Sequence, residues 1–494
     1  MSATQPPYRS TVQGSRRPKG SSQPAPLRRS PTLAAFLSFL VPGLGQLVSG
    51  RVRQGLTFLL PVLFLVALAI AMVLGDHIRL LGFLVRPEVL LGLFLLNVLF
   101  LIWRAAAIVD AWRSNHPGRV RVNALSTIVL AVLLLVTVGT HAVIGGTTYE
   151  IIDTLNTIFS GNGGGFGTLG GTPSAGDSGS GGPSTPGPTV QPIPAPLADG
   201  RLDILLIGGD AGVGRWSLRT DTLIVLSVDV NTGRAALFGI PRNLIGVPLA
   251  PENKAAYSCG CFPGLINALY VYASDPAHAK YFPEGNADTR GLIAVQGAIS
   301  QLIGRQLDGI VLVKLQGFVN LVDAIGGIDI NVPYAIHDSR YPLVNGTGYI
   351  VLNISKGPHH FNGTQALEFA RSRHQDSDYG RMQRQQLTLT ILAKKLTSDQ
   401  GIITQLPQLL DIAKNNLWTN LSIDDFSQFV SLALRTDIPH MAHITFIPPK
   451  YPEVLTTSEI KKIQAVVDTA LTTPLPTPTP SPSLKPTPTS ASTP

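Results

Sequence analysis

The chain has 494 residues, with 38 Lys and Arg against 30 Asp and Glu, and a formal net charge of +8 at pH 7. The positive charge is concentrated in residues 1–150, which hold 14 basic and 4 acidic side chains, whereas residues 199–471 are close to neutral. This distribution, without zinc-finger spacing or basic repeats, argues against nucleic-acid binding. Two cysteines exclude a disulfide framework and a cysteine-built zinc site.

Residues 1–32 are basic and rich in Pro and Ser, which predicts a disordered cytoplasmic tail. Residues 33–147 follow and form a predicted membrane part, with three apolar stretches near the ~20 residues that a bilayer requires. We predict these spans at about 56–74, 89–109 and 124–144. A shorter stretch, residues 33–48, contains Pro42-Gly43-Leu-Gly45-Gln46 and predicts a re-entrant segment or short helix. A fourth span or a cleaved signal peptide are the alternatives there.

Lys and Arg near the ends of the spans predict their orientation, because these residues resist translocation. Basic residues occur in the N-terminal tail, at Arg51 and Arg53, and in the loop from Arg113 to Arg121. If all three regions are cytoplasmic, the chain after residue 145 lies outside the cell. The sequence therefore predicts a multi-pass protein of the cell membrane with an extracytoplasmic C-terminal domain.

Residues 148–198 consist mainly of Gly, Ser, Thr and Pro and predict a linker, and residues 472–494 predict a disordered Pro/Thr/Ser-rich tail. Between them, residues 199–471 are long enough for one large domain. Apolar runs of strand length alternate there with helical patterns, for example at 203–207, 222–228, 289–303 and 379–396. This alternation predicts an α/β fold, and the sequence leaves open whether residues 397–471 belong to it.

Charged residues cluster at the ends of the predicted strands, where open α/β sheets place their ligands. Asp210 ends the first strand, Arg219 and Asp221 open the second, and Arg242 follows the third. Because these strands neighbour one another along the chain, their charged ends are candidates for one site.

A second charged group lies further along the chain. Arg371 and Arg373 are predicted on a short strand-like segment, where two residues apart means the same face. Asp378 then opens a predicted helix on which Arg381 and Gln385, four residues apart, share one side.

Several arginines at one site are typical of pyrophosphate binding, because the guanidinium group matches phosphate oxygens with paired hydrogen bonds. Neighbouring carboxylates suit Mg²⁺, which takes one or two acidic ligands together with phosphate oxygens and water. The alternative is a solvated strand and helix whose arginines pair with nearby Asp residues. In that alternative, Asp210 and Asp221 are a turn residue and a cap.

An ordered set of motifs extends over about residues 203–396. Its members are Leu-Leu-Ile-Gly-Gly-Asp210, Arg219-Thr-Asp221-Thr, Gly239-Ile-Pro-Arg242, Ile266-Asn267-Ala268, the segment Gly317 to Gly327, Gly363-Thr-Gln-Ala-Leu-Glu-Phe-Ala-Arg371-Ser-Arg373 and Asp378-Tyr-Gly-Arg381-Met-Gln-Arg384-Gln385-Gln386. In composition, order and spacing this set resembles the LytR-CpsA-Psr family of bacterial cell-wall glycopolymer ligases.

The resemblance implies an α/β/α sandwich with a central mixed sheet, preceded here by a helical transmembrane part. It implies a Mg²⁺-dependent phosphotransferase that moves a glycopolymer from an undecaprenyl or other polyprenyl pyrophosphate carrier to peptidoglycan. The implied partners are that lipid-linked glycopolymer, peptidoglycan and the lipid membrane. A binding or sensing module for polyprenyl phosphate and a lipid pyrophosphatase are the alternatives for the same residues.

The resemblance also implies roles for single residues. Asp210 and Asp221 correspond to metal-associated carboxylates, and Asp221 is our choice of base for the attacking sugar hydroxyl, with Arg242 and Arg371 as catalytic partners. The implied pyrophosphate ligands are Arg219, Arg242, Arg371, Arg373, Arg381 and Gln385. Asp378, orienting an arginine or assisting the metal, and Asn267 are further candidates.

The sequence departs from the family in three places. Asn243 stands where the family usually has Asp after the Pro-Arg pair, and Leu265 stands where it usually has Lys. The predicted three-span membrane part also exceeds the single anchor helix that is common in the family.

Two further pairs of residues invite a metal or redox interpretation. Cys259 and Cys261 are interpreted as a local disulfide or inert thiols and not as a redox centre. His359 and His360 are adjacent, so on an extended backbone their side chains diverge and do not form a metal pair.

Overall fold

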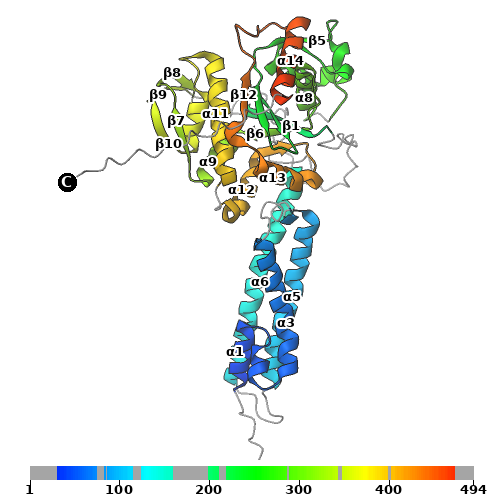
Figure 1. The fold of residues 1–494 in the computed structure, drawn as a ribbon, viewed down its shortest axis with the longest axis vertical. Coiled ribbons are helices and arrows are strands. Elements are labelled where there is room, and N and C mark those ends of the chain that lie inside the picture. Colours follow the sequence, from blue (N-terminus) through cyan, green and yellow to red (C-terminus); the bar gives the residue numbers. More distant parts are fainter. Residues whose placement is uncertain are drawn as a thin grey trace, which may run out of the picture. The chain divides into compact units, whose positions relative to one another are not determined.

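The computed structural model describes residues 30–74, 83–84, 86–114, 124–159, 199–210, 219–285, 289–342, 348–398 and 402–472 (Figure 1). The predicted basic tail up to residue 29, most of the predicted linker and the C-terminal tail from residue 473 lie outside these described residues. The chain divides into two compact units, Met1–Ala71 with Leu95–Gly145 and Met72–Phe94 with Gly146–Pro494.

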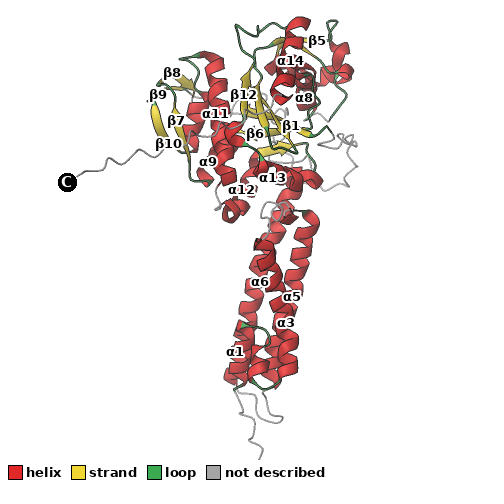
Figure 2. Cartoon of the chain, in the orientation of Figure 1, coloured by secondary structure: helices red, strands yellow, loops and turns green. Residues whose placement is uncertain are grey.

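The N-terminal part of the chain is helical (Figure 2). Its helices are α1 (Pro31–Leu40), α2 (Leu44–Val48), α3 (Val52–Leu74), α5 (Pro87–Ser114) and α6 (Ala124–Phe159). Three segments among the described residues are long and apolar enough to cross a membrane, namely Val52–Ala71, Pro87–Arg113 and Ala124–Phe159. They overlap the three stretches predicted from hydropathy, and the first ends at Ala71, three residues before the predicted end.

The Pro42-Gly43 turn joins α1 to α2 within the first unit. Gly43 has a φ of +95°, and a Cβ added there would lie 2.3 Å from the carbonyl oxygen of Gly55. Gln46 is fully buried, accepts a hydrogen bond from Ser38 Oγ at 2.8 Å and donates one to the carbonyl of Ala107 at 2.9 Å. Small residues thus allow close backbone approach, and the buried Gln46 side chain is hydrogen-bonded inside the helical unit.

The domain in the second unit is built on a six-stranded mixed sheet of order β11-β6-β1-β2-β3-β12. Its strands are β1 (Arg201–Asp210), β2 (Arg219–Asp229), β3 (Ala235–Gly239), β6 (Gly309–Lys314), β11 (Leu417–Thr419) and β12 (Ala442–Thr445). β1–β2, β2–β3 and β6–β11 are antiparallel, and β1–β6 and β3–β12 are parallel. The predicted α/β class with a mixed central sheet is confirmed.

Helices cover both faces of this sheet. On one face, α7 (Ile266–Ser274), α8 (Arg290–Ile303) and α14 (Thr457–Thr472) enclose the largest apolar core, which includes Leu205 and Phe238. On the other face, α13 (Phe426–Arg435) packs on Leu202 and Ile204, the residues that alternate with those of the first core. This alternation along β1 follows from the two-residue period of a strand that is buried on both sides.

A second lobe packs beside the sheet around its own apolar core. It comprises α9 (Leu315–Ala324), β7 (Ile328–Val332), β8 (Ile336–Pro342), β9 (Tyr349–Ile354), β10 (Gly357–Phe361), α10 (Gly363–Arg371) and α11 (Ser377–Ser398). The remaining elements are the β4–β5 pair (Ile245–Pro248 and Cys261–Leu265), α12 (Ile402–Asn416) and four short 3₁₀ turns at Pro251–Ala256, Pro276–Tyr281, Ile423–Asp425 and Ile438–His440. Cys259 and Cys261 form a disulfide just before β5.

One boundary differs from the sequence prediction, and one question that the sequence left open is answered. α6 continues to Phe159 and so includes the first residues of the predicted linker, because Leu155 and Ile158 of its last turns are buried against Leu410 of α12. Residues 397–471 belong to the same fold, since they supply β11 and β12 at the two edges of the central sheet.

Candidate functional site

The site lies where β2, the end of β3 and α11 meet, and one arginine there holds two carboxylates. Arg242 Nη1 donates to Asp221 Oδ1 at 2.8 Å, and its Nε donates to Asp378 Oδ2 at 2.7 Å. Arg381 Nη1 lies 3.1 Å from Asp378 Oδ1, and its Nη2 donates to the backbone oxygen of Asp221 at 3.1 Å. The fold therefore brings together two pairs of residues, Asp221 with Arg242 and Asp378 with Arg381, from segments 136 residues apart at Arg242 and Asp378.

Two neighbours extend this cluster. Asn267, in the first turn of α7, donates from its backbone to the carbonyl of Arg242 at 3.2 Å and from Nδ2 to Asp221 Oδ1 at 3.4 Å. Gln385, one turn beyond Arg381 on α11, donates from Nε2 to Thr222 Oγ1 at 2.9 Å. The spacing of Arg381 and Gln385 places both on the helix face that meets β2, as the sequence predicts.

The charges of the cluster stabilise one another. Burial acts to raise the pKa of Asp221, but the hydrogen bond from Arg242 and the charges of Arg242 and Arg381 outweigh it, so the pKa lies below its usual value. Burial lowers the pKa of Arg381, whose side chain is 6% exposed. Its Nε is buried with no hydrogen-bond partner among the described residues.

Arg371 and Arg373 lie at the end of a helix, so the strand-like prediction for this segment is wrong. α10 begins with a capping box, in which Asn362 and Gln365 each accept a hydrogen bond from the other's backbone N–H, and it ends at Arg371. The charge of Arg373 contributes to lowering the pKa of Arg381, which places Arg373 near the cluster. Arg371 lies near the buried hydroxyl of Tyr341, whose pKa burial raises to about 12 despite this positive charge.

A buried carboxylate that the sequence analysis missed holds this arginine segment. Asp338 of β8 is 0% exposed and accepts hydrogen bonds from Ser372 Oγ at 3.2 Å, Arg373 N at 3.0 Å and His374 Nδ1 at 2.7 Å. Burial acts to raise the pKa of Asp338, but hydrogen bonds from the backbone of Arg373, Arg340 and His374 lower it overall. The carboxylate is therefore ionised and fixes the backbone between the two arginines.

Arg384 holds the same segment from the opposite side. It is 2% exposed and donates from Nε to the carbonyl of Phe369 at 3.0 Å, and from Nη2 to the carbonyl of Ser372 and to Asp376 Oδ1. Although Arg384 belongs to the motif quoted above, all three of its guanidinium nitrogens donate hydrogen bonds inside the protein. Arg381 differs in that its Nε has no partner among the described residues. No local pattern distinguishes the two arginines in the sequence.

Asp210 and Arg219 complete the predicted set. The two residues face each other across the β1–β2 pair, two positions from Asp221 on the same strand ends. Their side chains lie outside the described part of the structure. The backbone pairing thus places them at the same ends of strands β1 and β2 as Asp221.

Comparison with known proteins identifies the family. The model of the LytR_cpsA_psr family matches residues 181–459. The chain belongs to the LytR_cpsA_psr family. This match covers more than half of the 494 residues and includes every residue of the cluster described above.

Two curated relatives and one solved structure illustrate the similarity. The polyisoprenyl-teichoic acid–peptidoglycan teichoic acid transferase TagU of Oceanobacillus iheyensis is 29% identical over 228 residues, 45% of this chain and 60% of the relative. TagV of Bacillus subtilis, named for the same activity, is 27% identical over 209 residues, 42% of this chain and 46% of the relative. The match to the crystal structure of B. subtilis TagV covers 55% of this chain and 97% of that chain, with 22% identity and a TM-score of 0.41.

The carboxylates of this LytR_cpsA_psr domain fit a metal held jointly with a substrate. No group of three or more His, Cys, Asp or Glu side chains that could hold a metal occurs in the described part of the chain. Both oxygens of Asp378 bind arginines, whereas the described contacts of Asp221 all go to Oδ1. Because Mg²⁺ needs only one or two carboxylates when phosphate oxygens complete its shell, Asp221 with Asp210 nearby is a suitable donor set.

A carboxylate also lies beside Asn243, where the family usually has Asp. Asn243 Nδ2 donates to Glu453 Oε1 at 2.5 Å, and the same oxygen accepts a hydrogen bond from Tyr379 Oη. Tyr379 follows Asp378 on α11, so Glu453 adds negative charge next to the cluster. The separation of 210 residues between Asn243 and Glu453 explains why the sequence analysis missed this contact.

Proposed function

We propose that this protein is a membrane-anchored phosphotransferase that moves a glycopolymer from a polyprenyl pyrophosphate carrier onto peptidoglycan. The observation that carries the proposal is the cluster of Arg242 and Arg381 around Asp221 and Asp378, in a domain of the LytR_cpsA_psr family. The names of the curated relatives, transferases of teichoic acid to peptidoglycan, support the choice of reaction.

In the proposed reaction, a hydroxyl oxygen of the acceptor attacks the phosphorus that bears the glycopolymer. A new phosphodiester bond forms, the phosphoanhydride bond breaks, and polyprenyl phosphate leaves with the electron pair. Arg242 and Arg381 are the proposed ligands of the two phosphates, with Arg219, Arg371, Arg373 and Gln385 as the remaining proposed ligands. Guanidinium donors that face the leaving phosphate stabilise the negative charge that develops there.

Asp221 is the proposed base for the acceptor hydroxyl. In the structure, the hydrogen bond from Arg242 is a main cause of its low pKa, which makes it a weak base. When Arg242 turns its donors to a phosphate, Asp221 loses that hydrogen bond and its pKa rises. The arrangement therefore couples substrate binding to proton acceptance by this carboxylate.

Mg²⁺ is the proposed cofactor, with Asp210 and Asp221 as its candidate ligands. When bound, it neutralises charge on the pyrophosphate and on the leaving group. A metal on Asp221 would lower the pKa of that carboxyl, so for Asp221 the roles of metal ligand and base are alternatives. Arg242, Arg381 and Asp378 do not require the metal for their own contacts, so they orient the phosphates in either state.

The proposed location is the bacterial cell membrane, with several spans and the domain outside the cell. The three candidate membrane helices support an anchored protein. The basic residues of the tail and of the loops support the orientation.

The test uses the full-length protein in nanodiscs with a polyprenyl pyrophosphate-linked oligosaccharide, Mg²⁺ and peptidoglycan, and follows the sugar by mass spectrometry. We expect sugar on peptidoglycan from the wild type, and its loss in the variant with Arg371→Ala and Arg373→Ala. Arg435→Ala, an exposed arginine of α13 whose Nε bonds only within its own helix in the described structure, is the matched control. Unchanged transfer in the double variant contradicts the proposal, and so does phosphate release without an acceptor, which indicates a pyrophosphatase.

A further inference from the structure

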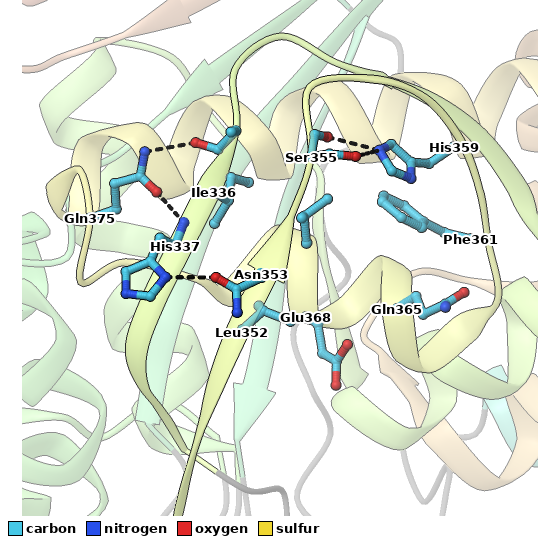
Figure 3. Close-up of a pocket in the computed structure, with 12 residues that line it drawn as sticks. Ile336, His337, Leu352, Asn353, Ser355, His359, Phe361, Gln365, Glu368 and Gln375 are labelled. Carbon is cyan, nitrogen blue, oxygen red and sulfur yellow. Dashed lines mark hydrogen bonds between the residues drawn. The ribbon is translucent and has the colours of Figure 1, made fainter.

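A groove of about 750 Å³ opens between the β8–β9 hairpin on one side and β10 and α10 on the other. Its apolar lining includes Ile336, Leu352 and Phe361 (Figure 3). Ile354 also lines it. Its polar lining residues are His337, Asn353, Ser355, His359, Gln365, Glu368 and Gln375. None of the cluster residues that bind Asp221 lines this groove, so it is a separate site in the second lobe.

The chemistry of the groove suits an uncharged polar chain. Its lining combines amide, hydroxyl, imidazole and carboxyl groups with no Lys or Arg, so it offers hydrogen bonds without a fixed positive charge. A phosphate-rich ligand would meet no cation there. Carbohydrate is the ligand class that presents both many hydroxyls and the apolar face of a sugar ring to such a mixed surface.

Glu368 gives the groove an unused acceptor. Its side chain is half-buried, lines the groove near Leu352 and Gln365 (Figure 3), and accepts no hydrogen bond from another group in the described part of the chain. Burial raises the pKa of this carboxyl, as expected for an acceptor that lacks a protein donor. A ligand hydroxyl would supply the missing donor.

The groove adjoins the arginine segment of the candidate site. Glu368 lies one helical turn before Arg371 on α10, and Gln375 lies two residues after Arg373. Gln375 Nε2 donates to the carbonyl of Ala335 at 2.8 Å, which ties the segment to the start of the β8–β9 hairpin. A chain that lies in the groove therefore passes close to Arg371 and Arg373, the residues that the proposed function assigns to phosphate binding.

We propose that this groove binds the glycan strand of the peptidoglycan acceptor and delivers its hydroxyl to the site. This inference rests on the proposed function for the identity of the acceptor. Glu368 and His359 are its specificity-determining residues, and Arg371 lies one helical turn beyond Glu368 on α10.

The adjacent histidines of β10 provide a matched pair of variants. His359 faces the groove, where its Nε2 bonds to Ser355, whereas His360 pairs with Asp329 on the other face at 2.7 Å. The test measures binding of a peptide-free peptidoglycan tetrasaccharide to the full-length protein in nanodiscs. We expect His359→Ala combined with Glu368→Gln to raise the Kd at least about tenfold, and His360→Ala to leave it within about twofold.

Transfer kinetics on the same proteins provide the second readout. The groove variant should raise the KM for the acceptor with little change in kcat and in the affinity for polyprenyl pyrophosphate, at an unchanged unfolding temperature. Unchanged tetrasaccharide binding in that variant overturns the inference even if the wild type transfers sugar. Loss of polyprenyl phosphate binding in place of glycan binding also overturns it, because the groove would then hold lipid. A wild type that binds the tetrasaccharide through this groove but transfers nothing would contradict the proposed function and leave the glycan site standing.

Discussion

Two carboxylates of this domain, Asp221 and Asp338, are both ionised in the fold but are held in different ways. The Asp221 carboxylate accepts hydrogen bonds from the Arg242 guanidinium and the Asn267 amide, two side chains that can turn to another anion. Asp338 is held by the backbone N–H groups of Arg340, Arg373 and His374, which cannot turn away without moving the chain. Side-chain donors that can turn to a substrate thus surround the carboxylate of the candidate site, whereas backbone donors hold the carboxylate that supports the neighbouring arginine segment.

The largest expected effect is on the rate of transfer and comes from removing the side-chain donor of Asp221. Arg242→Ala removes the donor shared by Asp221 and Asp378, and should lower the rate of transfer by about 10²- to 10³-fold. Because both carboxylates are partly exposed, the unfolding temperature should change little. Transfer assays and thermal unfolding of the full-length protein in detergent check both statements. A large loss of stability with proportionate loss of activity would place Arg242 among the supporting residues instead.

Removing the carboxylate that is held by backbone donors, Asp338, should lower the stability of the fold more than it lowers activity. Asp338→Ala leaves the donors of Ser372, Arg373 and His374 that meet this buried carboxylate without an acceptor, and should lower the free energy of unfolding by about 3 kcal/mol. Protease digestion should then cut near residues 372–376 before the rest of the domain. Ser339→Ala, at the next and exposed position of β8, is the control. Equal stability of the two variants would show that the backbone contacts to Asp338 contribute nothing net.

A third carboxylate, Asp308, differs from both. Its hydrogen bond from the Asp203 backbone and the charge of Arg305 are too weak to outweigh the effect of burial on its pKa. Burial raises its pKa to about 6, and the charges of Asp203 and Asp199 act in the same direction. Between pH ~4, its unfolded pKa, and pH 6 the folded state holds this proton more tightly, so the stability from this group is lost as the pH rises. Asp308→Asn should therefore stabilise the protein at pH 7 by about 1 kcal/mol, after allowance for its partial exposure, and should have no effect at pH 4. Thermal unfolding at both pH values distinguishes this from a pH-independent change.

The smallest expected effect concerns Asn267, which supplies a long 3.4 Å hydrogen bond to Asp221. Because that bond helps to lower the pKa of Asp221, Asn267→Ala should shift the acidic limb of the pH–rate profile upward and reduce transfer about threefold at low pH. Near neutral pH the rate should hardly change. A uniform loss at all pH values would indicate that Asn267 acts instead through its backbone contact with Arg242.

Local patterns predicted the part of the site that depends on local structure. The spacing of Arg381 and Gln385 placed both on one face of α11, and the ends of the predicted strands placed Asp221 and Arg242 at one sheet edge. The Arg371–Arg373 segment was mispredicted because its alternation of residues was weighed without the Asn362–Gln365 capping box, which is visible in the sequence.

Other features depend on tertiary contacts alone. Asp338 is one acidic residue in a strand, and nothing nearby in the sequence indicates that it will meet a helix end more than 30 residues later. Glu453 reaches Asn243 across 210 residues, and Arg384 differs from Arg381 only in what surrounds it. β11 and β12 have three and four residues, too few for a period to be recognised.

These two short strands also determine when the sheet is complete. β11 and β12 occupy its two outer edges, although both come from the last part of the domain. A growing or truncated chain that ends before residue 417 therefore carries β6 and β3 as bare edges, with unpaired N–H and C=O groups open to strands of other chains. The C-terminal segment thus completes the sheet, because β11 covers β6 and β12 covers β3. These pairings protect the domain from edge-to-edge aggregation.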